Sequence, residues 1–336
     1  MRISVVIPTY GRPQSLGRTL DALARQQRRA EETIVVARAQ DTASQEAARA
    51  HPLGARVVLV ERAGVVAAMN AGIAATSGEV VALTDDDAEP HADWLARIER
   101  SYEQGPRELA AVGGRDWVYI RGRLWDGAEQ VVGRVGWCGR VTGNHHLGVG
   151  PARDVDVLKG VNLSVRGELL REIAIDERLR GVGTEHHWEL ALCLALRARG
   201  LRVLYDPQIA VDHHSLPRVE DSRQFSAAEV SDAAHNMTLA LLEFLPPWRR
   251  AAYVVWAAAV GISPAPGIAQ LLRSPPRRRG QALASFLGAQ RGLAAGVLSY
   301  LRFRRARPAA RAVVSVHGGA EPSGAQPGDP PSGTLR

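Results

Sequence analysis

The chain has very few cysteines. Cys138 and Cys193 are the two among 336 residues. Two are too few for a disulfide framework, and nothing near them has the spacing of zinc ligands. The first residues lack the charged-then-apolar region of a secretory signal. Hydrophobic residues make up 46% of the chain, enough for a sizeable core. We therefore expect a reduced, cytosolic protein with one large domain or two small ones.

Acidic residues are absent from a long C-terminal stretch. From Arg249 to Ala320 there are twelve arginines and no Asp or Glu. This stretch carries +12, whereas the whole chain carries +7, which leaves −5 for the remainder. A basic segment on an acidic body usually faces a polyanion, either nucleic acid or an anionic membrane. The arginines lie among aliphatic residues without any nucleic-acid-binding signature, so a membrane surface is favoured and nucleic acid is not.

Charge is missing altogether from residues 251–272. Roughly 20 apolar residues suffice to span a bilayer, but Pro264 and Pro266 interrupt this run. Farther along, apolar residues between 283 and 301 are interspersed with arginines, as in interfacial amphipathic helices. We expect peripheral attachment to the inner face of the cell membrane, with shallow insertion at 251–272. The alternative is a helical subdomain that packs on the rest of the chain or forms a dimer.

The first hundred residues alternate strand and helix patterns. Short β-branched runs predict strands and small amphipathic runs predict helices. The expected strands are 3–7, 33–36, 56–60 and 80–83, and the expected helices follow Pro13 and cover 44–50 and 65–75. This alternation is typical of an α/β fold with a mixed, mostly parallel sheet flanked by helices. Residues 105–160 are rich in Gly, Arg and Trp and are expected to form loops, with a helix near 189–199 and a strand at 201–205 after them.

Three adjacent carboxylates, Asp85, Asp86 and Asp87, directly follow the fourth expected strand. Ligands of parallel sheets gather at the carboxyl ends of the strands. Oxygen ligands suit Mg²⁺ or Mn²⁺, which also bind substrate phosphates. The alternative is a solvated turn that caps the next helix. The position at a strand end favours the metal.

Several ordered motifs resemble the inverting family 2 glycosyltransferases with the Rossmann-like GT-A fold. They are Ser4-Val5-Val6-Ile7-Pro8-Thr9-Tyr10 with Arg12-Pro13, Met69-Asn70-Ala71-Gly72, Gly78 to Asp87, and Lys159-Gly160-Val161-Asn162-Leu163-Ser164-Val165-Arg166. The resemblance covers about residues 2 to 215. It implies a catalytic domain at 1–215, followed by a helical, Arg-rich extension at 216–314 that associates with a membrane or packs on the domain. A disordered Gly-, Pro- and Ser-rich tail at 315–336 completes the expected organisation.

The resemblance also implies roles for individual residues. For the nucleotide-sugar donor they are Pro8, Thr9, Tyr10, Arg12, Asp41, Asn70, Asp85 and Asp86. For the divalent cation, Mn²⁺ or Mg²⁺, they are Asp87, Asp85 and His213. For the acceptor they are Asn162, Arg166 and Trp137. The paired aspartates that usually read the nucleobase are absent after the second strand, where Asp41 alone remains, so the base of the donor stays open.

The residues at the position of the general base differ from the family pattern. His186 and His187 stand where the family has a Glu-Asp pair, and His187 takes the position of the usual base. A neutral imidazole is able to accept a proton near pH 7. Glu185 reaches the same point if the preceding loop is shifted, and Glu189 is either a third candidate or a first-turn residue favoured by the helix dipole. The prediction is divided between His187 and Glu185.

These observations predict a metal-assisted, inverting glycosyltransferase that acts on a hydroxyl of a lipid-linked or cell-envelope glycan. One alternative is a relative that binds nucleotide-sugars without catalysis, since its base is altered. A nucleotidyltransferase is another, but it would carry a Gly-rich phosphate loop after the first strand, and here Gly11 is alone. The sugar, the acceptor and the oligomeric state are not fixed by the sequence.

Overall fold

The computed structural model describes residues 1–181, 185–214, 226–262 and 264–306. The elements of the first part are β1 (Ile3–Thr9), α1 (Pro13–Ala24), β2 (Glu32–Arg38), α2 (Thr42–Ala50), β3 (Arg56–Val60), α3 (Val65–Ala74), β4 (Val80–Leu83), β5 (Ala88–Pro90) and α4 (Trp94–Gln104). The strand and helix alternation predicted for this part is therefore confirmed, with boundaries that differ by a few residues.

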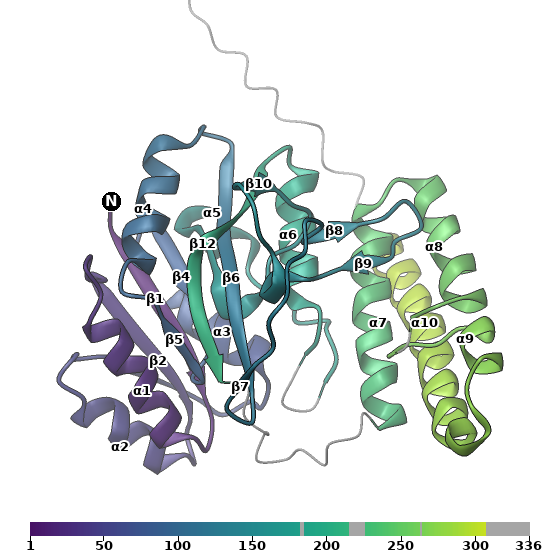
Figure 1. Cartoon of the computed structure of the whole chain (residues 1–336), viewed down its shortest axis with the longest axis horizontal. Helices are drawn as coiled ribbons and strands as arrows, with labels where there is room; N and C mark the ends of the chain where they lie inside the picture. The colour runs from purple at the N-terminus through teal and green to yellow at the C-terminus, as the bar shows by residue number, and fades with distance from the viewer. Residues whose placement is uncertain (182–184, 215–225, 263, 307–336) are drawn as a thin grey trace, which may run out of the picture.

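The central sheet is mixed and mostly parallel. Its strands follow the order β10-β12-β6-β11-β4-β1-β2-β3, and β5 and β7 pair with β12 and β6. The strands not yet bounded are β6 (Leu109–Ile120), β7 (Arg123–Leu124), β10 (Arg153–Asp154), β11 (Leu163–Arg166) and β12 (Arg202–His214). β1 pairs in parallel with both β2 and β4, whereas β11 runs antiparallel to β4 and β6. The carboxyl ends of β1 and β4 therefore lie at the same edge of the sheet (Figure 1).

Each face of the sheet carries its own hydrophobic core. Because side chains alternate along a strand, Ile7 of β1 packs with Leu16 of α1 and Trp94 of α4 on one face. Val6 points to the other face, where it joins a core that includes Met69 of α3. That second core continues through α5 (Gly167–Ile173) and α6 (Trp188–Ala198) into the C-terminal helices. The sheet is thus covered on both sides, as parallel strands require.

The prediction of loops over residues 105–160 is partly wrong. β6 is a 12-residue strand in the middle of the sheet, and β12 extends from Arg202 to His214 instead of ending at Tyr205. Gly113 and Gly114 obscure the strand pattern. A Cβ on Gly114 would come within 2.0 Å of the carbonyl oxygen of Ile209, so close strand packing requires glycine there. The remainder of this stretch consists of short strands, including β8 (Arg134–Val135) and β9 (Val141–Thr142), and of loops.

The C-terminal part is helical, as expected. It comprises α7 (Ala227–Phe244), α8 (Pro247–Ala259), α9 (Ile268–Leu272) and α10 (Arg279–Ala306). The uncharged run 251–272 is divided between α8, a loop and α9, because the chain turns back at Gly261, which bridges to Pro266. Among the described residues, no helix is long and apolar enough to cross a membrane. The predicted disordered tail at 315–336 lies outside the described residues.

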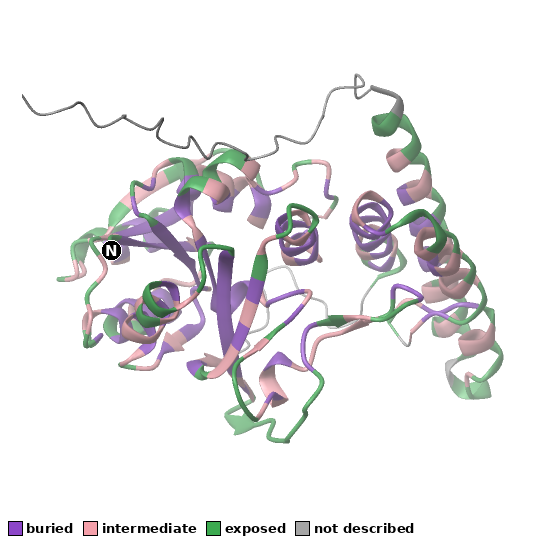
Figure 2. Ribbon diagram, turned by 90° about the horizontal axis from the view of Figure 1, so that it is seen from above, coloured by how far each residue is buried: buried purple, intermediate pink, exposed green. Residues whose placement is uncertain are grey.

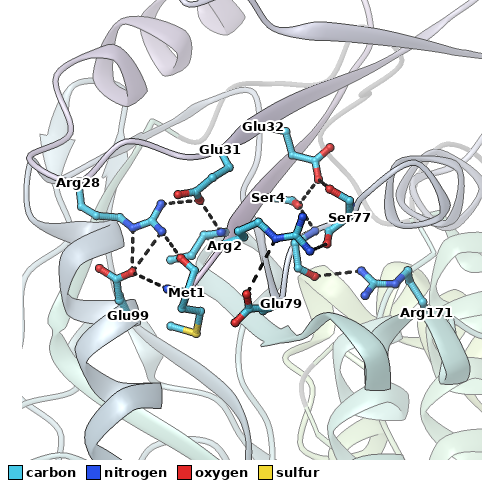
Figure 3. A network of polar contacts seen from close by, with 12 residues as sticks. Met1, Arg2, Ser4, Arg28, Glu31, Glu32, Ser77, Glu79, Glu99 and Arg171 are labelled. Carbon is cyan, nitrogen blue, oxygen red and sulfur yellow. Dashed lines mark hydrogen bonds and ion pairs between the residues drawn. The ribbon is translucent and has the colours of Figure 1, made fainter.

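Polar side chains close the edge of the sheet where β1 begins (Figure 3). Glu32 accepts hydrogen bonds from the hydroxyls of Ser4 and Ser77, at 2.6 and 2.8 Å. Nearby, Arg28 bridges Glu31 and Glu99. These contacts fasten β1 to β2 and α4 at the edge opposite the carboxylate cluster. The ion pairs at this edge therefore stabilise the fold.

Small residues set the distance between α10 and α7. Gly288, Gly292 and Gly296 recur at four-residue intervals and face α7. A Cβ on Gly292 would lie 2.1 Å from the carbonyl oxygen of Ser231, and one on Gly288 would lie 2.4 Å from that of Ala227. The two backbones are therefore in direct contact along this line.

We predict that Gly292→Ala destabilises the protein by about 1–3 kcal/mol, because the added methyl group forces α10 away from α7. Gly280→Ala is the matched control, since no atom lies within 4 Å of a Cβ there and alanine favours the helix. Thermal or denaturant unfolding compares the two variants with the wild type. Equal stability of both variants would contradict the close helix contact.

Candidate active site

The carboxylate cluster is built by two neighbouring strand ends. Thr9 ends β1, and Asp85, Asp86 and Asp87 follow β4, so the parallel pairing of these strands brings them together. The Thr9 hydroxyl donates to Asp86 Oδ2 at 2.7 Å. Arg12, in the turn after β1, reaches Asp86 at 3.2 Å and Asp87 at 3.0 Å. The sequence motif is thus a folded unit in which one guanidinium offsets part of the charge of two carboxylates.

His213 completes a possible cation site with two of the aspartates. Because β12 pairs with β5 at His213 and Ala88, the end of β12 lies beside Asp87. His213 Nε2 is 3.4 Å from Asp87 Oδ1. One ligand atom each from Asp85, Asp87 and His213 lies within 4.8 Å of the others, and we call these three residues the strand-end triad. The structure therefore brings the three predicted metal ligands together.

Burial makes the cluster electrostatically unfavourable without a counter-ion. Burial raises the pKa of Asp85 to about 7, and the charge of Asp87 adds to this effect. Burial and Asp87 also raise the pKa of Asp86 to about 6, although Arg12 and Thr9 act in the opposite direction. A divalent cation would remove this repulsion, since it favours the charged carboxylates.

A fourth carboxylate, Asp116 on β6, supports His213 from behind. Asp116 is fully buried and is paired with Lys159, and its Oδ2 is 3.6 Å from His213 Nδ1. Burial alone would raise its pKa, but Lys159 and His213 lower it to about 2. Although burial lowers the pKa of His213, Asp116 and Asp87 together raise it to about 9. Sequence reasoning missed Asp116 because it lies in the stretch expected to form loops.

The residues present fit a divalent cation. Histidine ligands of metals usually direct their second ring nitrogen to a carboxylate, which is how His213 lies between Asp87 and Asp116. Within the described part of the chain, Asp116 Oδ1 is buried and has no hydrogen-bond partner. Two carboxylates and one imidazole are a suitable ligand set for Mn²⁺, and carboxylates alone suit Mg²⁺.

The two favoured base candidates are both tied to helix ends. Glu185 is buried, and its Oε2 accepts from the backbone N–H groups of Val65 and Val66 at 2.8 and 3.3 Å. It therefore caps the N-terminus of α3. His187 precedes α6 with a left-handed backbone, φ 68°. Burial, with a contribution from His186, lowers its pKa to about 4.

Glu189, the third base candidate, interacts electrostatically with Asp85. It is in the first turn of α6, and its Oε1 accepts from the N–H of Gly160 at 3.3 Å. Burial raises its pKa, and the charge of Lys159 counteracts this. Its own charge in turn raises the pKa of Asp85. The Glu189 carboxylate thus acts on the pKa of one residue of the strand-end triad.

The other predicted donor residues lie near the end of β1 or in α3. Pro8 is half-buried within β1, and the ring of Tyr10, 39% exposed, lies 5.3 Å from the Arg38 guanidinium. Asp41 accepts from the N–H groups of Gly11 and Ser44, so it caps α2 and holds the turn after β1. The Asn70 side chain exchanges two hydrogen bonds with the backbone of Ile175. Tyr10 is the member of this set with an open ring surface.

The predicted acceptor residues are dispersed. Asn162 is buried, donates to the carbonyl groups of Arg115 and Ile209 and accepts from the Trp94 indole. Arg166 pairs with Val80, at the amino end of β4, and donates to the Leu109 carbonyl. Trp137 is 68% exposed in the turn between β8 and β9, where Arg249 of α8 donates to its carbonyl group. The structure does not bring these three side chains together.

We predict a pH effect on stability that is specific to His187. Its folded pKa, about 4, is below the usual value near 6.5. The unfolded chain therefore takes up this proton first, and stability present above pH 6.5 is lost as the pH falls toward 4. The slope is at most about 1.4 kcal/mol per pH unit. In His187→Asn this contribution disappears, and asparagine tolerates the left-handed backbone. Denaturant unfolding across this range measures the difference, and parallel curves for both proteins would contradict it.

Comparison with known proteins agrees with this geometry. Residues 4–148 match the family model described as glycosyl transferase family 2. A glucosyl-dolichyl phosphate glucuronosyltransferase of Haloferax volcanii is 27% identical over 228 residues, which are 63% of this chain and 69% of that protein. Glycosyltransferase AglE of the same organism is 32% identical over 101 residues, which are 28% of this chain and 33% of that protein.

Solved structures show the same fold. The S. aureus TarS 1–349 structure in complex with UDP-GlcNAc has a TM-score of 0.59 at 14% identity, and the match covers 94% of this chain and 95% of that one. GalNAc-T7 with UDP, GalNAc and Mn²⁺ has a TM-score of 0.59 at 17% identity, with 77% of this chain and 50% of that chain covered. At these identities the likeness establishes the fold. The chain therefore has the GT-A fold, and its residues 4–148 match glycosyl transferase family 2.

Proposed function

We propose that the protein transfers a sugar from a nucleotide-sugar to a hydroxyl of a lipid-linked or cell-envelope glycan, with inversion at the anomeric carbon and assistance from Mn²⁺ or Mg²⁺. The observation that carries this proposal is the strand-end triad beside Thr9 and Arg12. The lipid-linked acceptor is supported by the Haloferax volcanii relative, whose name specifies a glucosyl-dolichyl phosphate substrate.

The donor is expected to lie along the carboxyl ends of β1 and β4. Its nucleoside would rest near Pro8, Thr9 and Tyr10, where the Tyr10 ring is exposed. Its diphosphate would lie at the strand-end triad, within reach of the charge of Arg12. Asp85 and Asp87 with His213 would hold the cation. When bound, the cation supplies Lewis-acid stabilisation of the negative charge that grows on the departing diphosphate.

Glu189 is the proposed general base. Its carboxylate takes the proton from the acceptor hydroxyl while the acceptor oxygen forms a bond to the anomeric carbon of the sugar. The bond from that carbon to the diphosphate oxygen breaks, and its electron pair leaves with the nucleoside diphosphate. One displacement of this kind inverts the anomeric configuration. A raised pKa suits Glu189 to this task, because a base acts best when its pKa approaches the working pH.

Neither of the other candidates is as well placed. Glu185 already satisfies two backbone N–H groups at the start of α3, and removing it from that position would leave those donors buried without a partner. His187 has a pKa near 4, so its imidazole is a weak proton acceptor. We therefore assign His187 to the turn that begins α6 and Glu185 to the end of α3.

Lys159 provides a second positive group near the reaction. Its ammonium group is paired with Asp116, is about one-third exposed and interacts with the charge of Glu189. Together with Arg12 it balances negative charge on two sides of the triad.

The proposed place of work is the inner face of the cell membrane, where the protein would be a peripheral protein. Nucleic acid is not a proposed partner, and we assign no oligomeric state.

We predict that Glu189→Gln lowers the rate of transfer by about 10²- to 10⁴-fold, because the acceptor loses its base. Nucleotide binding should stay unchanged, since the proposed donor site at the ends of β1 and β4 does not include Glu189. Nucleoside diphosphate release, measured against a panel of UDP-, GDP- and dTDP-sugars with an acceptor, reports the rate, and calorimetry reports binding. His187→Asn is the matched control and should retain most of the activity. Full activity of Glu189→Gln would exclude its role as the base.

Removal of a metal ligand should separate cation binding from folding. We expect Asp87→Asn to weaken Mn²⁺ binding by at least about tenfold, since a neutral amide replaces a charged ligand. Mn²⁺ titration by calorimetry in the presence of UDP or GDP measures this loss. Asp21→Asn, at an exposed carboxylate on α1, is the control. If Asp87→Asn bound Mn²⁺ like the wild type, the strand-end triad would not be the cation site.

A further inference from the structure

The long helix α10 has two opposite faces. Its glycine face packs against α7 through Gly288, Gly292 and Gly296. On the opposite side, leucines recur at spacings that place them in one stripe along the helix. They are Leu283, Leu287, Leu298 and Leu301, with exposed fractions of 48%, 57%, 54% and 43%. In the described part of the chain nothing covers this stripe.

The neighbouring helices add further exposed apolar side chains. Trp248 and Val255 of α8 are 63% and 68% exposed, and Ile268 and Leu272 of α9 are 54% and 76% exposed. In Figure 2 exposed residues, in green, follow the helices at the end of the chain on the side away from the sheet. Large exposed apolar side chains gathered on neighbouring helices are typical of an interaction site.

Positive charge surrounds the apolar stripe. From Pro247 to Ala306 there is no Asp or Glu. Arg249 and Arg250 are held by hydrogen bonds inside the protein, to the carbonyl groups of Val135 and Leu245 among others. Exposed arginines of this part are Arg273, Arg277, Arg279, Arg291, Arg302 and Arg304. Arg291 and Arg302 lie one helical step from the leucine stripe and therefore flank it.

We propose that this face, formed by the exposed leucines of α10 and the arginines around them, docks on the surface of an anionic lipid bilayer. We call it the leucine–arginine face. The leucines would enter the boundary between headgroups and acyl chains, and the arginines would pair with lipid phosphates. Each basic residue near an anionic surface strengthens binding about fivefold. Because no described helix is able to cross a bilayer, the helix lies in the plane of the surface.

The charge of the leucine–arginine face favours a bilayer over a second copy of the chain or nucleic acid. A second copy of the chain docked on the same face would bring two sets of arginines together without any acidic partner on either side. Nucleic acid would satisfy the arginines but would leave four leucines in water. A bilayer with anionic headgroups satisfies both groups at once. This surface specifies the peripheral attachment that is part of the proposed function. Lipid binding is measured without turnover, so the surface and the proposed reaction are able to fail separately.

Co-sedimentation of the full chain with vesicles tests the proposal. We expect binding to vesicles of phosphatidylcholine with phosphatidylglycerol, weaker binding at high salt and little binding to phosphatidylcholine alone. Leu287→Gln/Leu298→Gln should weaken binding at least about tenfold, because both exposed leucines leave the boundary region. Arg291→Gln/Arg302→Gln should weaken it about 25-fold, which corresponds to two charges. Leu59→Gln, at an equally exposed leucine of β3, should bind like the wild type.

Folding and nucleotide affinity of each variant are checked by circular dichroism and calorimetry, so that loss of binding is not loss of structure. The absence of binding to anionic vesicles would overturn the proposal. Equal binding by all variants would overturn the assignment to this face. A dimer seen by light scattering that dissociates in Leu287→Gln/Leu298→Gln, without vesicle binding by the wild type, would show that a second copy covers the face instead.

Discussion

Negative charge at the end of β4 is the constraint to which the surrounding structure responds. Asp85, Asp86 and Asp87 share a largely buried position, and Asp116 adds a fourth carboxylate behind them. Carboxylates in such a place repel one another unless positive groups lie close by. The protein supplies Arg12 from the turn after β1, His213 from the end of β12 and Lys159 from the loop before β11. These three groups come from distant parts of the sequence. The topology of the sheet is therefore what brings positive charge to the carboxylates.

The remaining imbalance explains why the cluster suits a cation and a diphosphate. The protein's own positive groups leave the pKa of Asp85 near 7, because they do not fully compensate for burial and for Asp87. A cation would complete the compensation and would also attract the phosphates of a donor. Glu189 approaches the same region from α6, on the side of Lys159. In the proposed reaction, the leaving group would be held at the strand-end triad and the proton acceptor would be Glu189 of α6.

Local sequence patterns predicted the first half of the sheet and the carboxylates that follow β4, because β1 to β4 have regular alternation and clear turns, whereas the expected role of His213 came from the family resemblance. Local patterns did not predict β6, the strand that carries Asp116 into the site. In β6, Arg115, Asp116 and two glycines replace the apolar alternation, and the strand is identified by its pairing with β11 and β12 instead. The role of Asn162 is likewise fixed by partners distant in sequence, namely Trp94, Arg115 and Ile209. A glutamate in the first turn of a helix, such as Glu189, has an ordinary explanation in sequence alone, and its effect on the pKa of Asp85 arises only in the folded chain.

The most direct test of the central claim is a crystal structure with Mn²⁺ and a nucleoside diphosphate, with anomalous data collected at the manganese edge. The account predicts one strong anomalous peak bound by Asp87 and His213, with Asp85 in the first or second coordination shell and the diphosphate of the nucleotide on the open side of the ion. A nucleotide bound at the ends of β1 and β4 without a peak at the strand-end triad would contradict the account. So would a manganese ion held elsewhere.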